Sequence, residues 1–173
     1  MMLKRHASRT VPCEAALAYE LLSDYAAYEQ WMPGVKSSKV LAQETNFAIA
    51  ELEFIARPGE KMTVECLHAP RQTVIARTLT GNKPAFKLAW DIAPTESGEA
   101  LVTVRMEGHL RTLFRMGWSS IFADPQKGLE SLVDLVATYG DSPGSDKVIE
   151  ISETEDGLVC SYRGTKYQLK PIS

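Results

Sequence analysis

Cysteine is scarce in this sequence, and its three cysteines, Cys13, Cys66 and Cys160, are odd in number and far apart. A disulfide framework needs paired cysteines, usually at high density in a small secreted domain. We therefore expect reduced thiols and no structural disulfide. Cys66 and His68 alternate onto one face of a strand, but a tetrahedral metal site needs two further ligands. We interpret this pair as packed core residues and predict neither a metal nor a cofactor.

Long hydrophobic runs are also absent. No window approaches the ~18 to 20 apolar residues that a membrane-spanning helix requires. Near the N-terminus, Glu14 and Glu20 interrupt the only Ala- and Leu-rich stretch, so the pattern of a secretion signal is not present. The sequence therefore predicts a cytoplasmic protein without an integral membrane segment.

Basic residues are too few and too dispersed to indicate a nucleic-acid partner. The chain has 22 acidic against 19 basic residues, and no stretch gathers more than a few Lys or Arg side chains. A nucleophile elbow, a P-loop and a dinucleotide-binding glycine fingerprint are all missing, which removes the strongest signs of catalysis. With 173 residues, 45% of them hydrophobic, the chain suits one globular domain and a small appendage.

The first part of the chain shows a strand followed by two helical segments. Leu3 to Val11 is typical of an edge strand and ends at Pro12. A helix is expected from Pro12 to near Ser23, and a shorter helical turn from Tyr25 to Trp31. Pro33-Gly34 closes this region, because this dipeptide favours a turn.

Six strand-like runs follow between residues 35 and 110, separated by short breaks that contain Gly, Pro or Asn. Such short connections favour an antiparallel meander. Apolar and polar residues alternate most clearly over residues 50–54, 86–92 and 102–106, which predicts a sheet with one apolar face. The opposite face would carry Glu51, Glu53, Arg105, Glu107 and His109 as solvated side chains rather than as acid/base groups.

A long helix is predicted to begin at Asp124-Pro125 and to stop at Gly140, with Leu129, Leu132, Val133 and Val136 along one stripe. The segment from Leu113 to Phe122 fits either a helical lead-in or a packed loop. Residues 141–145 have the composition of a linker, and residues 146–173 are expected to form a small β-meander. A hairpin set of this size is marginal alone, so we expect it to pack on the main domain or to form a homodimer.

Two segments resemble the START-like superfamily, which includes polyketide cyclases, birch-pollen-allergen relatives and coenzyme-Q-binding proteins. The stretch Leu21 to Val35 looks like the helix-helix-entry segment of that superfamily, and Pro84 to Trp90 is similar to a strand in its coenzyme-Q-binding branch. The resemblance covers about Leu3 to Gly140. It implies an α+β helix-grip fold, in which a curved antiparallel seven-stranded sheet wraps a long C-terminal helix. The domain would then comprise residues 1–140.

The resemblance implies a cavity for a hydrophobic small molecule such as a lipid, a quinone or a polyketide. We expect a binding or transport module; a cyclase, aromatase or dehydratase is the alternative, and a ribosome- or protein-associated regulator fits the acidic balance less well. A place in the pocket and a place in the core are equally compatible with the sequence for Trp31, Phe54, Phe86, Trp90 and Met106. Trp31 is expected at the cavity mouth. The expected ligand-binding residues are Trp31, Met32, Leu52, Phe54, Phe86, Leu88, Trp90, Val104, Met106 and Leu132.

Few other side chains suggest chemistry. Cys13 is predicted in a first helical turn, where the helix dipole would lower its pKa, but the sequence places no base beside it. Tyr19, Tyr25 and Tyr28 are expected to pack between helices or line the rim, rather than to donate a proton. His68 would be the one titratable group placed for proton transfer if its face of the strand points inward. We predict no catalytic residue.

Overall fold

The computed structural model describes residues 1–69, 72–78, 86–111, 117, 120–121, 123–140, 150–155, 157–162 and 165–169. The chain forms two compact units, Met1–Leu135 and Val136–Ser173. The division expected from the sequence, with a domain boundary at residue 140, remains a prediction, and the expected linker at 141–145 lies outside the described residues.

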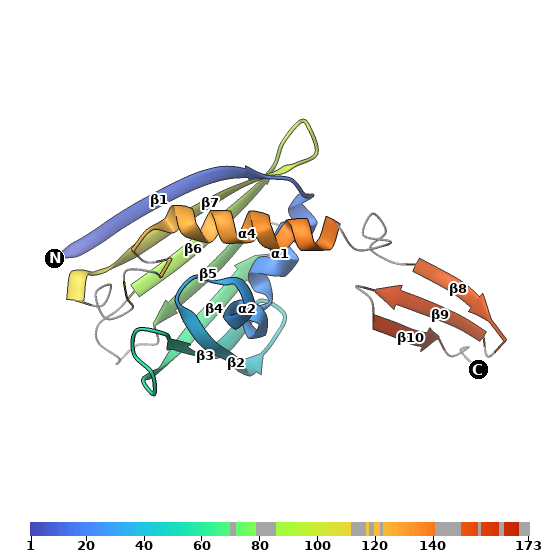
Figure 1. Ribbon diagram of the computed structural model, residues 1–173, viewed down its shortest axis with the longest axis horizontal. Helices are drawn as coiled ribbons and strands as arrows, with labels where there is room; N and C mark the ends of the chain where they lie inside the picture. The colour runs from blue at the N-terminus through green and yellow to red at the C-terminus, as the bar shows by residue number, and fades with distance from the viewer. Residues whose placement is uncertain are drawn as a thin grey trace. The chain divides into compact units, whose positions relative to one another are not determined.

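Seven antiparallel strands form the sheet of the first unit, in the order β1-β7-β6-β5-β4-β3-β2 (Figure 1). The predicted edge strand is therefore found at one edge of the sheet, as β1, beside the last strand of the meander. The strands are β1 (Met2–Val11), β2 (Val35–Gln43), β3 (Phe47–Phe54), β4 (Lys61–Ala69), β5 (Thr73–Thr78), β6 (Phe86–Pro94) and β7 (Ala100–His109).

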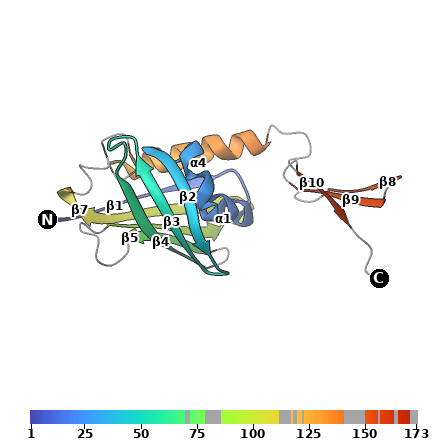
Figure 2. The ribbon, with the colours of Figure 1, turned by 90° about the horizontal axis from the view of Figure 1, so that it is seen from below.

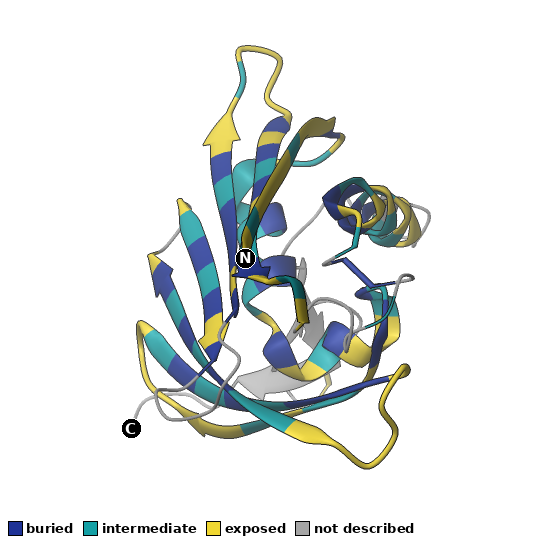
Figure 3. Cartoon of the chain, turned by 90° about the vertical axis from the view of Figure 1, so that its left-hand side faces the viewer, coloured by how far each residue is buried: buried dark blue, intermediate teal, exposed yellow. Residues whose placement is uncertain are grey.

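Helices cover one side of this sheet. They are α1 (Ala15–Ser23), the short 3-10 helix η1 (Tyr25–Ala27), α2 (Tyr28–Trp31) and the long α4 (Pro125–Gly140). Figure 2 shows strands β2 to β5 in front of α1 and α4, and Figure 3 shows how the sheet curls around the helical side. The predicted α+β helix-grip architecture is confirmed.

Alternation decides which residues the curved sheet turns toward the helices. In β7, buried and more exposed residues alternate along the whole strand, from Ala100 to His109. The same pattern places Phe86, Leu88, Trp90 and Ile92 of β6 on the buried side. Successive side chains of a strand point to opposite faces, so this side is the concave, helix-facing surface of the sheet.

The start of α4 agrees with the sequence prediction. The Asp124 carboxylate accepts a hydrogen bond from the backbone N–H of Gln126 at 3.1 Å, which is the contact of an N-cap residue. Leu129, Leu132 and Val136 are buried, as the apolar stripe requires. Most of the undecided segment from Leu113 to Phe122 lies outside the described residues.

The start of α1 differs from the prediction, because the helix begins at Ala15 and not at Pro12. The backbone N–H of Cys13 donates to the carbonyl of Val11 at 2.8 Å, which forms a tight turn before the helix. Glu14 has extended backbone dihedrals and is the N-cap. Pro12 and Cys13 therefore belong to the turn between β1 and α1.

The Pro33-Gly34 turn contacts the segment that leads into α4. The backbone N–H of Ile121 donates to the carbonyl of Pro33 at 3.2 Å. Gly34 has a φ of 85°, and a Cβ atom at this position would lie 2.5 Å from the Cβ of Ser120. Glycine is thus required both by the backbone conformation and by the close approach.

The second unit contains a separate three-stranded antiparallel sheet in the order β10-β9-β8 (Figure 1). Its strands are β8 (Glu150–Thr154), β9 (Gly157–Tyr162) and β10 (Thr165–Leu169). The described part of the tail therefore consists of three short antiparallel strands.

Candidate functional site

The concave face of the seven-stranded sheet carries the candidate site. Trp90 of β6 pairs with Val74 of β5 and with Val104 of β7, and Val74 pairs in turn with His68 of β4. Directly opposed residues of an antiparallel sheet share a face. His68 therefore points toward the helices, which the sequence alone did not decide.

Nine of the ten expected ligand-binding residues are buried, and Trp31 is half-buried. The expectation that these residues contact a ligand remains a prediction. The buried set comprises Met32 before the Pro33-Gly34 turn, Leu132 of α4, and the strand residues Leu52, Phe54, Phe86, Leu88, Trp90, Val104 and Met106.

A chain of aromatic rings runs through this interior. His68 and Tyr25 have ring centroids 5.9 Å apart, Tyr25 and Tyr28 are 5.6 Å apart, and Tyr28 and Trp31 are 5.7 Å apart. Trp31 in turn lies 6.1 Å from Trp90. These spacings are typical of packed aromatic pairs, so helix residues and sheet residues form one continuous aromatic row.

Two members of this row hold buried polar atoms without a partner. The indole nitrogens of Trp31 and Trp90 are both buried, and neither has a hydrogen-bond partner among the described residues. Most buried polar groups in proteins are hydrogen-bonded, so two neighbouring exceptions need an explanation. Both groups are donors only, which means that each requires an acceptor.

The His68 ring, by contrast, is fully hydrogen-bonded. Its Nε2 lies 2.8 Å from the carbonyl oxygen of Thr45, which can only accept, so Nε2 carries the hydrogen. In the neutral ring Nδ1 is then an acceptor, and the Tyr25 hydroxyl donates to it at 3.0 Å. Burial raises the pKa of the Tyr25 phenol well above its ordinary value, so Tyr25 remains a neutral donor.

These contacts also define the roles of the neighbouring residues. Tyr28 is buried, and its hydroxyl donates to the carbonyl of Leu22 at 2.5 Å. Cys66 is a buried free thiol whose pKa is raised to about 12 by burial. It shares the concave face with His68, but both His68 nitrogens are already engaged. Among the described residues, no group of three or more His, Cys, Asp or Glu side chains is placed to hold a metal ion.

Small side chains occupy the middle of the concave face. Ala76 of β5 lies between Cys66 of β4 and Leu88 of β6 in the cross-strand register. On the other side of Cys66 stands Ala48 of β3, and the next inward position of that strand is Ala50. The large apolar side chains of the buried face are Leu52 and Phe54 of β3, Phe86, Leu88, Trp90 and Ile92 of β6, and Met106 of β7, whereas Ala48, Ala50, Val64, Cys66, Val74 and Ala76 present only methyl, thiol and isopropyl groups.

Helix α4 comes close to the sheet at Gly128. A Cβ atom added to Gly128 would lie 2.3 Å from Cδ1 of Ile121 and 3.1 Å from the Trp90 ring. Within the described residues, the backbone of α1 otherwise packs more closely on β5, β6 and β7 than the backbone of α4 does. Gly128 thus permits the helix to rest on Trp90, while its larger side chains face the sheet elsewhere.

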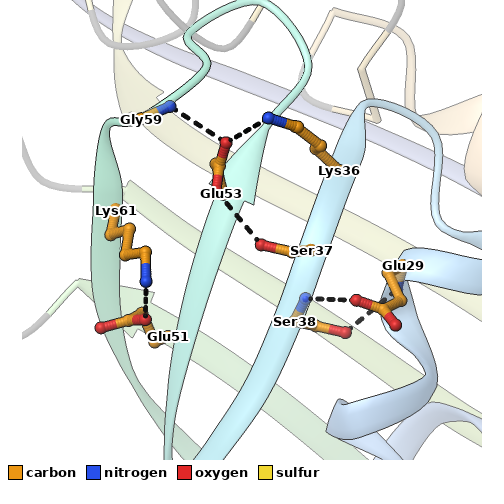
Figure 4. Close-up of polar contacts among 8 residues, drawn as sticks. All are labelled: Glu29, Lys36, Ser37, Ser38, Glu51, Glu53, Gly59 and Lys61. Carbon is orange, nitrogen blue, oxygen red and sulfur yellow. Dashed lines mark hydrogen bonds and ion pairs between the residues drawn. The ribbon is translucent and has the colours of Figure 1, made fainter.

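The convex face carries ion pairs instead. Glu51 pairs with Lys61 at 3.1 Å, and Arg105 pairs with Asp91 at 2.7 Å (Figure 4 shows the first pair). Glu107 lies 3.6 Å from Lys4. The solvated convex role predicted for Glu51, Arg105 and Glu107 is confirmed, and His109 is exposed.

Glu53 differs from that prediction, because it is only 8% exposed. Its Oε1 accepts from Lys36 Nζ at 2.8 Å and from the backbone N–H of Gly59 at 3.0 Å, while Ser37 donates to Oε2 at 3.4 Å (Figure 4). The hydrogen bond from Lys36 is the main cause that lowers the pKa of the Glu53 carboxyl. Glu53 therefore ties β2 to the turn after β3.

Cys13 also differs from the prediction. It precedes α1 instead of lying in its first turn, and burial raises the pKa of its thiol to about 11. The helix dipole does not activate this cysteine, because a thiolate there would lose more in solvation than it gains.

Three features of this interior were not predicted from the sequence: the small centre of the concave face, the contact at Gly128 and the hydrogen bonds of His68. The alternation of Ala48 and Ala50 with larger residues was a usable signal for the first of these. The other two depend on groups brought together from distant parts of the chain.

Comparison with known proteins places this geometry in a family. No helix among the described residues has the length and apolar character needed to cross a membrane. A search of curated proteins finds no match to the chain. The family model described as "Polyketide cyclase / dehydrase and lipid transport" matches residues 2–137.

Solved structures with a similar fold include three bacterial proteins. The Zhui aromatase/cyclase from Streptomyces sp. R1128 is 13% identical with a TM-score of 0.68, and the alignment covers 82% of this chain and 98% of that chain. A STAR-related lipid transfer protein from Xanthomonas axonopodis is 17% identical with a TM-score of 0.57, covering 78% and 85% of the two chains. A START superfamily protein from Mycobacterium smegmatis is 15% identical with a TM-score of 0.57, covering 79% and 97%. The curved sheet and the C-terminal helix have the fold of these neighbours, and the family model matches most of the chain. The chain therefore belongs to the polyketide cyclase / dehydrase and lipid transport family.

Proposed function

We propose that the first unit binds or transports an apolar small molecule, such as a lipid, a quinone or a polyketide-like compound, between the concave face and α4. The ten expected ligand-binding residues would surround it. The observation that carries the proposal is the small centre of the concave face, where Ala48, Ala50 and Ala76 occupy positions that a filled core would give to larger side chains. Burial of the ligand would contribute about 25 cal/mol of binding free energy per Å² of apolar surface, before the entropic costs of association are subtracted.

Enlarging the small side chains tests this proposal. Ala76→Leu and Ala50→Leu should each lower the affinity for 2-methyl-1,4-naphthoquinone at least tenfold, because the added carbons would occupy ligand space. The melting temperature should stay close to that of the parent protein. In a filled core, the same changes would cause overpacking, which typically costs about 1 to 3 kcal/mol.

Ala93→Leu is the matched control, since Ala93 belongs to β6 but is exposed. It should alter neither binding nor melting. A clear fall in melting temperature for Ala76→Leu, with unchanged affinity, would contradict the proposal. Affinity is measured by equilibrium dialysis and stability by thermal unfolding followed by circular dichroism.

We further propose that Trp31 lies at the entrance to the binding region. Its side chain is half-buried, its indole nitrogen is buried, and it ends α2 just before the Pro33-Gly34 turn. In the variant Trp90→Phe/Trp118→Phe, only Trp31 remains, and its emission should respond when a fatty acid or a quinone binds. Unchanged emission, with binding shown independently by dialysis, would contradict this placement.

A cyclase, aromatase or dehydratase is the second candidate, and one observation favours it. His68 of the concave face and Tyr25 of η1 form a hydrogen-bonded pair of titratable side chains. Their contacts with each other and with Thr45 hold both groups in place, which supports a binding role more than proton transfer to a ligand. Conversion of a linear poly-β-keto thioester by the parent protein, lost in His68→Asn, would establish the enzymatic function.

The remaining expectations from the sequence are part of the same proposal. We expect a cytoplasmic protein without a nucleic-acid partner, and a tail from residue 146 that packs on the main domain or pairs with a second copy. A chain ending at Tyr139 should stay folded but become less soluble or change its oligomeric state, as measured by light scattering. Rapid proteolytic trimming of the tail from the full chain, without a change in mass distribution, would contradict the tail proposal.

A further inference from the structure

The unpaired indole N–H groups of Trp31 and Trp90 bear on the chemical class of the ligand. Trp90 is 0% exposed, so no surface water reaches it directly, and the Trp31 nitrogen is buried although its ring is half-buried. The ring centroids are 6.1 Å apart and the ring planes are inclined by 55°. Two neighbouring indole rings in an apolar interior therefore each carry an unpaired N–H donor, and both donors need an acceptor.

The surroundings of the indoles favour a neutral acceptor over an anionic one. The buried polar residues among those described are Glu53, His68, Thr78 and Ser120, and none is a Lys or an Arg. Both His68 nitrogens are engaged, and the Thr78 hydroxyl accepts from the backbone N–H of Phe86 at 2.9 Å. A carboxylate beside Trp90 would lose its hydration without gaining a cationic partner.

Two arginines lie on the concave side by register, but they do not provide a cationic partner for a carboxylate beside Trp90. Arg5 and Arg9 of β1 face Met106 and Val102 of β7, but both arginines are exposed at the edge of the sheet. Arg5 already donates a hydrogen bond to the carbonyl of Ala123. A charged group held by these arginines would therefore remain near the surface, away from fully buried Trp90.

Resting on the proposed function, we infer that the ligand is a neutral, carbonyl-bearing apolar molecule, a ketone or a quinone, whose oxygen accepts hydrogen bonds from the indole N–H groups of Trp90 and Trp31. A saturated or aromatic hydrocarbon of the same size fits the apolar face but leaves both donors unpaired. A carboxylate of the same size brings an uncompensated charge.

Three matched probes test the inference on the full-length chain. The ketone-type probe is 2-methyl-1,4-naphthoquinone, the hydrocarbon is 2-methylnaphthalene, and the anion is 2-naphthoate. A neutral hydrogen bond contributes about two- to tenfold in affinity, so the quinone should bind roughly tenfold or more tighter than the hydrocarbon, and the anion should bind most weakly. In ¹H–¹⁵N spectra, the indole signals of Trp31 and Trp90 should shift downfield with the quinone and much less with the hydrocarbon.

Variants then assign the effect to the donors. Trp90→Phe and Trp31→Phe keep an aromatic ring but remove one N–H, and each should reduce the quinone-to-hydrocarbon affinity ratio by about two- to tenfold. Ile92→Val trims a buried residue two positions from Trp90 on the same face of β6 without removing a donor. This control should change both affinities in parallel and leave their ratio unaltered.

The outcomes separate the inference from the proposed function. Binding of the hydrocarbon as tight as that of the quinone, or an unchanged ratio in both Trp variants, would overturn the inference and leave hydrophobic binding standing; buried water on the indoles would give this result. Absence of binding by all three probes to the parent protein overturns the proposed function and the inference with it.

Discussion

The two faces of the seven-stranded sheet differ in how their polar side chains are paired. On the convex face, charged side chains from neighbouring strands pair with each other, as Glu65 and Arg77 do at 2.5 Å. On the concave face, His68 is fully hydrogen-bonded by Tyr25 and Thr45, while the indole nitrogen of Trp90 and that of the neighbouring Trp31 in α2 are unpaired. Each exposed ion pair adds little to the free energy of unfolding, whereas a buried polar group without a hydrogen-bond partner lowers it. The concave face is therefore where single substitutions should have the largest effects.

The largest effect is expected from a charge on the concave side. Leu132 of α4 is 0% exposed, and Leu132→Glu would place a carboxylate in the apolar interior. We expect a loss of roughly 3 kcal/mol or more in the free energy of unfolding, measured by urea denaturation. Leu101→Glu is the control on the convex face, where Leu101 is 39% exposed, and it should cost less than about 1 kcal/mol. Equal losses for the two variants would contradict the contrast between the faces.

The next largest loss of stability is expected at Gly34, in the turn that contacts the segment before α4. Gly34→Ala combines a positive φ with a clash against Ser120, whereas Gly98→Ala has the same φ of 85° and no atom within 4 Å of the new Cβ. The strain alone costs roughly 1 to 2 kcal/mol at either site, and overpacking against Ser120 should add about 1 to 3 kcal/mol at Gly34. Thermal and urea unfolding of the two variants give the difference directly. Similar losses would show that the Ser120 segment moves away without cost.

Removing the Tyr25 hydroxyl group tests how much its hydrogen bond to the buried His68 contributes to stability. Tyr25→Phe leaves Nδ1 of His68 without its donor, and we expect a loss of about 1 to 3 kcal/mol in unfolding free energy. The convex counterpart is Ser8→Ala, which removes an exposed hydroxyl pair with Thr103 and should cost less than about 0.5 kcal/mol. ¹⁵N spectra of the parent protein should show the hydrogen of neutral His68 on Nε2. The opposite tautomer would contradict the assigned hydrogen bonds.

The smallest effect concerns the buried carboxylate of the convex side and depends on pH. The folded-state pKa of Glu53 is lowered below its ordinary value of 4.5, mainly by the hydrogen bond from Lys36. Its stabilising contribution is therefore fully present above that value and is lost as the pH falls through the folded-state pKa. Glu53→Gln should lower the melting temperature at pH 7, and the difference from the parent should shrink in acid below pH 4.5.

Glu51→Gln is the control for this pH series, because it removes only the partly exposed pair with Lys61. Its cost should be at most about 1 kcal/mol. A difference between parent and Glu53→Gln that stays constant from pH 7 into acid would contradict the role assigned to the Lys36 contact.

The sequence by itself determined most of the sheet. Alternation at 86–92 and 102–106 identified the buried face, since a period of two leaves only one way to bury the apolar residues of a strand. The N-cap at Asp124 was also predictable, because a capping contact is local and spans two residues. The start of α1 was misplaced for a local reason as well: Pro12 suits a first helical turn, but the turn at Cys13 takes precedence.

Only the tertiary structure decided the character of the interior. The buried environment of Glu53 depends on Lys36 of β2 and on Gly59 in the next turn, and the orientation of His68 depends on its register with β5. The pairing of the indoles joins residues 31 and 90, and the contact of Gly128 with Trp90 joins the last helix to the sheet. A sequence pattern of short period records which face of one element is apolar. Such a pattern does not show which groups from distant elements come into contact across that face. At this site, those contacts determine which buried polar groups have a hydrogen-bond partner.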